Sequence, residues 1–260
     1  MSQIKTITSP ADAARRSSAL GGERLLVLIP AFNEEGRVGG VVHDVRRVVP
    51  TADVLVIDDG SSDETRAEAV SAGAQVLRLP INSGYGAALQ AGHKHAVREG
   101  YTLVGQLDGD GQHPAEHLPV LLDQLLSTDS DVVIGSRFLD GDGHYRASAA
   151  RKVGIALFAR VASTVMRQHV SDPTSGYQVM RVAVARFFST DVYPSDYPDA
   201  DILILLHRSG FRVTEVGVQM LMPTGKSMHS GHRSLYYVYK MWLSILVTLL
   251  RRRGGESRDG

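Results

Sequence analysis

The sequence has no cysteine, no net charge and no long uninterrupted apolar segment. Without cysteine there is no disulfide framework and no thiolate nucleophile, as is typical of a reducing compartment. The 28 Lys and Arg residues balance 28 Asp and Glu residues, so the composition gives no support to a nucleic-acid partner. No segment reaches the roughly 18 apolar residues of a membrane-spanning helix, and no signal peptide is visible. We therefore expect a cytoplasmic location.

The residues that are present are typical of a globular protein, with 43% hydrophobic and 22% charged among 260 residues. Residues 1–23 are polar and small, and we expect them to form a mobile N-terminal arm. Residues 24–232 are long enough for one domain with a sizeable core. An apolar and basic segment, residues 233–260, follows this domain.

The first half of the domain alternates between apolar runs and helical spacing. The runs 25–29, 54–57, 103–107 and 131–135 are typical of strands buried on both faces. Between the first two, valines at positions 38, 41, 42 and 45 have the spacing of one helix face. Because strands and helices alternate five times over about 115 residues, the pattern predicts an α/β fold with a mostly parallel central sheet flanked by helices.

The rhythm changes after residue 135. We expect a long helix over 148–168, a strand over 177–180, a loop with two prolines, a helix over 201–208 and a strand over 211–220. The domain therefore divides into a nucleotide-binding half, residues 24–135, and an acceptor half, residues 136–232.

Asp108, Asp110 and Gln112 follow one of the buried runs on a glycine-rich turn. We call residues 108–112 the acidic turn. Oxygen ligands at alternating positions suit a hard divalent cation that keeps positions free for phosphate. The alternative is an ordinary acidic surface turn, since Asp-Gly is common turn chemistry.

Polar clusters also follow the first three predicted strands, and all four should face one crevice at the carboxyl edge of the sheet. Each cluster alone could serve as a helix cap or a turn, but four on one edge favour a ligand site. The sequence lacks the glycine motifs of a P-loop ATPase and of a dinucleotide enzyme.

Taken in order, these motifs resemble the family 2 glycosyltransferases of GT-A fold. The motifs are Pro30-x-x-Asn33-Glu34, Asp58-Asp59-Gly60-Ser61, Asn82-x-Gly84-x-Gly86 and Asp108-x-Asp110-x-Gln112. Gly135-Ser136-Arg137-Phe138, the segment 172–177 and Gly225-Lys226-Ser227 narrow the resemblance to the polyprenol-phosphate branch, similar to dolichyl-phosphate mannose synthases. The resemblance implies an inverting transferase that uses a UDP- or GDP-sugar, Mg²⁺ or Mn²⁺, and a polyprenyl-phosphate acceptor.

The resemblance also implies roles for single residues. The nucleotide would be held by Pro30, Asn33, Glu34, Asp58, Asp59, Gly84 and Asp108, and the metal by Asp108, Asp110 and Gln112. The acceptor phosphate would meet Arg137, Arg151, Lys226 and Ser227. The catalytic residues would be Asp110, Arg137 and Asp201. For the two arginines the alternatives are a surface ion pair at Arg137 and a solvated helix face at Arg151.

The acceptor decides whether a general base is required. A lipid phosphate is already anionic near neutral pH, whereas a sugar hydroxyl must lose a proton to a base. Asp199 and Asp201 lie where the family keeps an acidic motif, and Asp201 matches it better. Asp201 is therefore expected to act as a base or to orient the acceptor, with a first-turn helix acid as the alternative.

Residues 234–253 have an apolar sequence that contains tyrosines and Trp242 and ends in three arginines. Such an amphipathic helix suits the surface of an anionic membrane, which predicts a peripheral protein on the inner face of the cell membrane. The alternatives are a helix docked on the protein's own core, a homodimer interface or an integral-membrane partner.

The expected function is therefore hexose transfer to polyprenyl phosphate, within the synthesis of cell-envelope polysaccharide. One alternative is transfer to a sugar hydroxyl of a lipid-linked or polysaccharide acceptor. Further alternatives are a sugar-1-phosphate nucleotidyltransferase and a non-catalytic subunit that binds a sugar nucleotide.

Overall fold

The computed structural model describes residues 22–139, 149–194 and 200–221, with the backbone alone for 149–153. The expected N-terminal arm and the expected helix at 234–253 lie outside these ranges, apart from the end of the arm. The strands are β1 (Leu25–Ala31), β2 (Asp53–Asp58), β3 (Gln75–Arg78), β4 (Leu103–Gln106), β5 (Val132–Ser136), β6 (Gln178–Arg181) and β7 (Val213–Gly217). The helices are α2 (Val38–Val48), α3 (Thr65–Ser71), α4 (Tyr85–Arg98), the short 3₁₀ helix η1 (Ala115–His117), α5 (Leu118–Ser127), α6 (Ala149–Met166), α7 (Val182–Phe188) and α8 (Ala200–Arg208).

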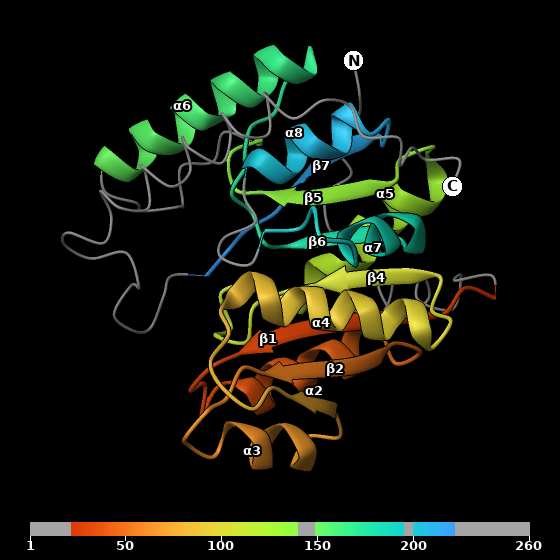
Figure 1. Ribbon diagram of the computed structural model, residues 1–260, viewed down its shortest axis with the longest axis vertical. Helices are drawn as coiled ribbons and strands as arrows, with labels where there is room; N and C mark the ends of the chain where they lie inside the picture. The colour runs from red at the N-terminus through yellow and green to blue at the C-terminus, as the bar shows by residue number, and fades with distance from the viewer. Residues whose placement is uncertain (1–21, 140–148, 195–199, 222–260) are drawn as a thin grey trace.

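The strands form one sheet in the order β3-β2-β1-β4-β6-β5-β7 (Figure 1). The first four strands of this order are parallel, with Val27 of β1 opposite Val54 of β2. Strand β6 is antiparallel to both β4 and β5, and β7 returns parallel to β5. The expectation of an α/β fold with a mostly parallel sheet is confirmed.

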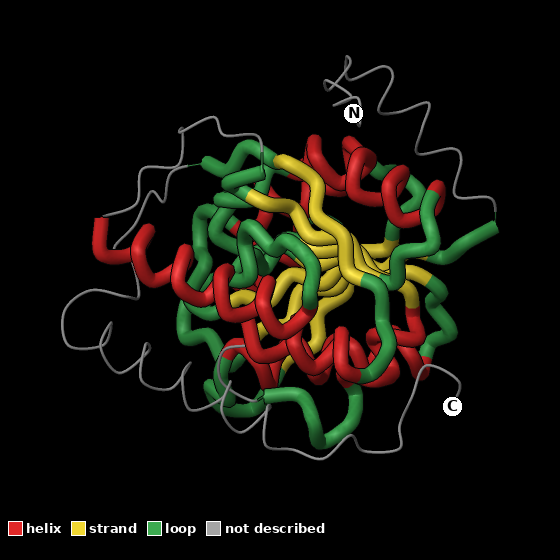
Figure 2. The backbone as a smooth tube through the Cα atoms, turned by 90° about the horizontal axis from the view of Figure 1, so that it is seen from above, coloured by secondary structure: helices red, strands yellow, loops and turns green. Residues whose placement is uncertain are grey.

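Helices cover both faces of the sheet (Figure 2), and the core lies in two layers, one on each face. Strand β1 is buried along its whole length and supplies both layers, because successive side chains point to opposite faces. Leu26 and Leu28 belong to the layer that also contains buried residues of α4, α6, α7 and α8. Leu25, Val27 and Ile29 pack with α2 and α5 on the other face. Within the described ranges, no helix is both long and apolar enough to cross a bilayer.

The acceptor half differs from expectation at one helix. Residues 182–188, expected to lie in a loop, form α7 directly after β6. Its apolar residues Val184, Ala185, Phe187 and Phe188 are buried on one face, and the helix packs against α4. The expectation was wrong because this helix has only seven residues, too few for a helical period to stand out.

Candidate active site

The carboxyl ends of the parallel strands meet at one edge of the sheet, as the arrowheads of β1, β2 and β4 show in Figure 1. Hydrogen bonds tie the loops at this edge to one another. The backbone N–H of Asn33 donates to Ser61 Oγ over 3.0 Å, and Asn33 Oδ1 accepts from Ser62 N over 3.0 Å. Asn33 adopts a left-handed φ of 55°, which asparagine tolerates better than most residues. It therefore clamps the loop after β1 to the loop after β2.

Asp58 and Asp59 follow each other at the end of β2 but have different partners. Asp58 Oδ1 accepts from Ser61 N over 2.8 Å, and its Oδ2 lies 3.5 Å from Arg78 Nε. Asp59 accepts the backbone N–H groups of Ser83 and Gly84 over 2.7 and 2.9 Å. Asp59 therefore holds the loop after β3, including the Gly84 predicted to bind the nucleotide.

The loop after β2 requires glycine at position 60, where it meets the loop after β3. Gly60 has a φ of 74°, a conformation in which other residues are strained. A Cβ there would also lie 2.7 Å from the carbonyl carbon of Ile81 and 2.8 Å from Asn82 N. The loops after β2 and β3 are thus in direct backbone contact beside the two aspartates.

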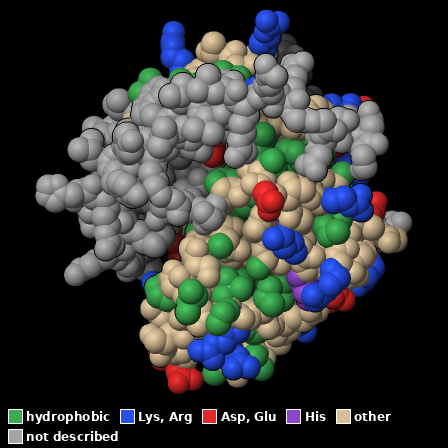
Figure 3. All heavy atoms as spheres, in the orientation of Figure 1, with side chains coloured by type: hydrophobic (Ala, Val, Ile, Leu, Met, Phe, Trp, Pro, Cys, Tyr) green, Lys and Arg blue, Asp and Glu red, His purple; other side chains and the backbone are tan. Residues whose placement is uncertain are grey.

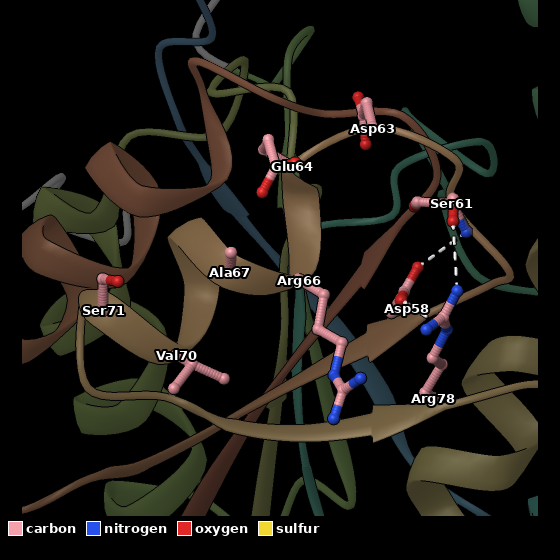
Figure 4. Close-up of a pocket in the computed structure, with 9 residues that line it drawn as sticks. All are labelled: Asp58, Ser61, Asp63, Glu64, Arg66, Ala67, Val70, Ser71 and Arg78. Atoms are coloured by element: carbon pink, nitrogen blue, oxygen red, sulfur yellow. Dashed lines mark hydrogen bonds and ion pairs between the residues drawn. The ribbon is translucent and has the colours of Figure 1, made fainter.

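A pocket of about 490 Å³ opens on the α3 side of β2 and β3 (Figure 4). Its lining residues are Asp58, Ser61, Asp63, Glu64, Arg66, Ala67, Val70, Ser71 and Arg78. Among the described residues, Asp58 Oδ2 is buried and accepts no hydrogen bond. The lining includes no residue of the acidic turn, so this pocket does not contain the candidate metal ligands.

The acidic turn is held from two sides. Asp108 Oδ1 accepts from Tyr85 Oη over 2.8 Å, which ties the turn to the first residue of α4. The backbone N–H of Asp108 donates to His113 Nδ1 over 3.0 Å, so the His113 ring accepts at that nitrogen. This ring is buried and stacked on Tyr177 with centroids 5.1 Å apart.

Asp110 and Gln112 are bonded to each other. Asp110 Oδ1 accepts from Gln112 N over 2.9 Å, and Asp110 Oδ2 accepts from Gln112 Nε2. Among the described residues, no group of three or more His, Cys, Asp or Glu side chains forms a ready metal site. Asp108 and Asp110 nevertheless fit a hard cation, because two carboxylates leave coordination positions for phosphate oxygens and water.

Glu34 is close enough to Asp108 and Asp110 for their negative charges to act on its pKa, in addition to burial. Burial raises the pKa of Glu34 to about 7, Arg37 lowers it, and the charges of Asp110 and Asp108 raise it further. Arg37 Nε is 2.7 Å from Glu34 Oε2, so the raised pKa persists despite a close cation. The loop after β1 and the acidic turn therefore share one electrostatic site that a cation would relieve.

Arg137, directly after β5, is held by the segment between α6 and β6, residues 171–176, which we call the 171–176 loop. Nε and Nη2 of Arg137 each lie 2.6 Å from one oxygen of Asp172, and Nη2 also donates to Thr174 Oγ1 over 2.7 Å. The two side chains are 8% and 0% exposed. Arg137 is therefore part of a buried bidentate ion pair.

The same loop reaches the acidic turn at its other end. A Cβ on Gly176 would lie 2.8 Å from Tyr85 Oη and 3.5 Å from Asp108 Oδ1. Gln106 Nε2 donates to the carbonyl of Gly176 over 3.1 Å and to Tyr85 Oη over 3.4 Å. The 171–176 loop thus connects the predicted metal ligand Asp108 with the predicted phosphate ligand Arg137.

Comparison with known protein families identifies the family to which this chain belongs. The family model described as glycosyl transferase family 2 matches residues 26–189. The chain belongs to this family. The resemblance inferred from the ordered motifs is therefore confirmed, and the enzyme is a glycosyltransferase.

Individual relatives place the glycosyltransferase near enzymes of lipid phosphates. It is 31% identical over 220 residues to an undecaprenyl-phosphate mannosyltransferase of Micrococcus luteus, covering 80% of this chain and 88% of the relative. It is 31% identical to a dolichyl-phosphate hexose transferase of Haloferax volcanii, covering 75% and 81%. The fold is similar to that of glucosyl-3-phosphoglycerate synthase from Mycobacterium tuberculosis, solved with Mn²⁺ and UDP, with a TM-score of 0.67, 20% identity and coverage of 97% and 84%. The expected GT-A fold is confirmed.

Of the remaining predicted site residues of the glycosyltransferase, only some lie within the described part of the chain. Asp201 lies in the first turn of α8 and is only 4% exposed. Arg151 lies on α6, but its side chain is outside the described residues. Asp199, Lys226 and Ser227 also lie outside the described ranges.

Sequence reasoning missed Tyr85, Gln106, His113 and Glu215 as residues that support the site. Tyr85 contacts an aspartate 23 positions away, and Glu215 contacts a loop 43 to 44 positions away. The only local signal was the place of Tyr85 between two glycines of the third motif. Pairing over such separations has no local pattern to reveal it.

Proposed function

We propose that this enzyme transfers a hexose from a UDP- or GDP-sugar to polyprenyl phosphate, with inversion at the anomeric carbon. The observation that carries the proposal is the 171–176 loop, because it joins a carboxylate pair suited to a cation to a buried arginine suited to phosphate. The similarity to the undecaprenyl-phosphate and dolichyl-phosphate transferases supports the same acceptor class.

The donor would lie across the loops after β1, β2 and β3. Glu34, Asp58 and Asp59 would hold the base and ribose, with Pro30, Asn33, Gly84 and Asp108 contacting the nucleotide. Mg²⁺ or Mn²⁺ held by Asp108, Asp110 and Gln112 would offset the charge that develops on the departing diphosphate. Because Asp59 is already bonded to the backbone of Ser83 and Gly84, its contribution includes shaping this loop.

The acceptor phosphate would attack without a general base, because it is anionic near neutral pH. Its oxygen forms a bond to the anomeric carbon as the bond from that carbon to the donor diphosphate breaks. The electron pair leaves with the nucleoside diphosphate, and no proton is removed. Arg137, with Arg151, Lys226 and Ser227, would bind the acceptor phosphate, and Asp201 would orient the acceptor.

We also propose that residues 234–253 bring the enzyme to the inner face of the cell membrane, where a polyprenyl acceptor is located. The apolar and aromatic sequence that precedes three arginines supports this assignment. A homodimer or an integral-membrane partner would be the competing use of this segment.

Donor binding measured by calorimetry tests the proposal first. A panel of UDP- and GDP-sugars is titrated with and without Mn²⁺ into the wild type and into Asp110→Ala. We expect metal-dependent binding of one nucleotide, lost in the variant. Absence of binding to every donor would overturn the glycosyltransferase assignment of this site.

A transfer assay to polyprenyl phosphate with the donor found then tests the acceptor. We expect product from the wild type, and Asp201→Asn should retain donor binding and much of its turnover. If turnover falls severely in Asp201→Asn and product forms only on a sugar hydroxyl, the alternative acceptor class is correct.

A further inference from the structure

Glu215 on β7 is a carboxylate with four hydrogen bonds to the 171–176 loop. Its Oε1 accepts from Ser171 N and Asp172 N over 3.0 and 2.8 Å. Its Oε2 accepts from Ser171 N over 2.8 Å and from Ser171 Oγ over 2.9 Å. Glu215 therefore fixes the backbone from which the Asp172 side chain extends.

Both carboxylate oxygens of Asp172 in turn accept two hydrogen bonds each. Oδ2 accepts from the backbone N and Nε of Arg137, and Oδ1 accepts from Arg137 Nη2 and Thr174 Oγ1. A guanidinium has five N–H donors in a rigid plane. Because Nε and Nη2 are both directed at Asp172, the orientation of the carboxylate sets the orientation of the guanidinium.

A second bond chain reinforces this arrangement. Ser171 Oγ is 2.6 Å from Ser136 Oγ, and Ser136 Oγ accepts from Phe138 N over 3.1 Å. The residues on both sides of Arg137 are therefore tied to the same serine that Glu215 holds. Displacement of Ser171 would move Arg137 through its side chain and through its backbone.

We propose that Glu215 is a positioning residue for the transfer reaction, acting through Ser171 and Asp172 to hold Arg137 toward the acceptor phosphate. This inference rests on the proposed function of Arg137. In the described part of the chain, Glu215 hydrogen-bonds to Ser171 and Asp172 of the 171–176 loop, and this loop connects it to Arg137. We therefore expect a change at Glu215 to raise the KM for the acceptor specifically, because a small displacement of a positioning group can slow a reaction strongly.

The test compares Glu215→Gln with Asp131→Asn, using the full-length enzyme. Asp131 is a matched control, because it is a buried carboxylate that accepts the backbone N–H of Arg212 over 2.8 Å, at the end of the β5–β7 pair where β5 begins, away from Arg137. For Glu215→Gln we expect the KM for polyprenyl phosphate to rise roughly 10-fold, with the KM for the donor unchanged. For Asp131→Asn we expect lower stability without this KM change.

A double-mutant cycle separates positioning from a general structural role. In an Arg137→Lys background, Glu215→Gln should add little to the acceptor KM, because the bidentate pair is already lost. Equal changes in donor and acceptor KM, or full additivity with Arg137→Lys, would overturn the inference. If the wild type makes no product on polyprenyl phosphate, the proposed function fails; if it does and Glu215→Gln is unaffected, this inference alone fails.

Discussion

The carboxylates in the two halves of the crevice differ in whether a positively charged side chain neutralises them. At the acidic turn, Asp108 and Asp110 lie near Glu34 with no arginine or lysine ion pair of their own among the described residues. In the acceptor half, Asp172 is fully buried and engaged on both oxygens by Arg137. One half therefore accumulates negative charge that a cation would compensate, whereas the other compensates it within the protein.

Under the proposed function, one sheet edge would bind two ligands that are both anionic. A diphosphate is anionic and requires a cation between it and the carboxylates, whereas an acceptor phosphate can meet a guanidinium directly. The 171–176 loop lies between these arrangements. Its Gly176 is close to Asp108, and its Asp172 holds Arg137.

The largest effect on stability should come from breaking the ion pair between Asp172 and Arg137 in the acceptor half. Asp172→Ala leaves Arg137 buried without its carboxylate, and removal of one partner of a buried pair typically costs about 3–5 kcal/mol. We expect a loss of this size in the free energy of unfolding, measured by urea denaturation at neutral pH. Asp108→Ala is the matched control in the other half.

For Asp108→Ala we expect little loss or a small gain in stability, because the change removes one of several crowded negative charges. The variant does lose the hydrogen bond from Tyr85. Equal destabilisation by the two substitutions would show that both halves are compensated in the same way, and the contrast between them would be lost.

A smaller effect should come from Tyr85, which supports the half proposed to bind a cation. Tyr85→Phe removes the O–H that donates to Asp108 Oδ1 over 2.8 Å. Groups that orient a metal ligand typically contribute 10- to 100-fold to metal affinity. We therefore expect a weaker Kd for Mn²⁺ by about 10-fold, measured by calorimetry in the presence of the donor nucleotide.

Tyr101→Phe provides the control for that experiment. Tyr101 Oη also donates to an aspartate, Asp53, over 2.8 Å, but at the start of β2, far from the carboxyl edge of the sheet. The Kd for Mn²⁺ should be unchanged in Tyr101→Phe. If Tyr85→Phe leaves the Kd unchanged as well, the acidic turn is organised by its own backbone.

The strands and helices of the donor half could be predicted because the sequence signals for them are local. Strand β1 and the centre of β2 are uninterrupted apolar runs, and a polar cluster directly follows each parallel strand, so the topology alone brings the clusters to one edge. The raised pKa of Glu34 and its dependence on Asp110 and Asp108 agree with that placement.

The acceptor half was less predictable because its contacts are distant in sequence. Arg137 and Asp172 are 35 positions apart, and the sequence offered no sign that one would neutralise the other. Asp59 was predicted to bind the nucleotide, but its bonds to Ser83 and Gly84 depend on how two loops meet in space. Hydrogen-bond partners of this kind follow from tertiary packing, which no local period encodes.

The smallest predicted effect is a pH dependence of metal binding through Glu34. Burial raises the pKa of Glu34 from 4.5 to about 7, so this carboxyl binds its proton more tightly in the folded protein than in the unfolded chain. Its contribution to stability is therefore most favourable below about pH 4.5 and is lost as the pH rises through 7. A cation on Asp108 and Asp110 favours the ionised form, so metal binding should release part of a proton near pH 6.

We accordingly expect the affinity for Mn²⁺ to rise several-fold between pH 5.5 and 7.5, by less than the tenfold per pH unit that release of one whole proton would give. Titrations of Mn²⁺ at constant ionic strength across this range would measure it. Glu34→Gln should flatten the profile and leave only the titration of the ligands themselves at lower pH. A profile that is equally steep in Glu34→Gln would show that Glu34 does not share the electrostatic site of the acidic turn, and the accumulated charge would then belong to that turn alone.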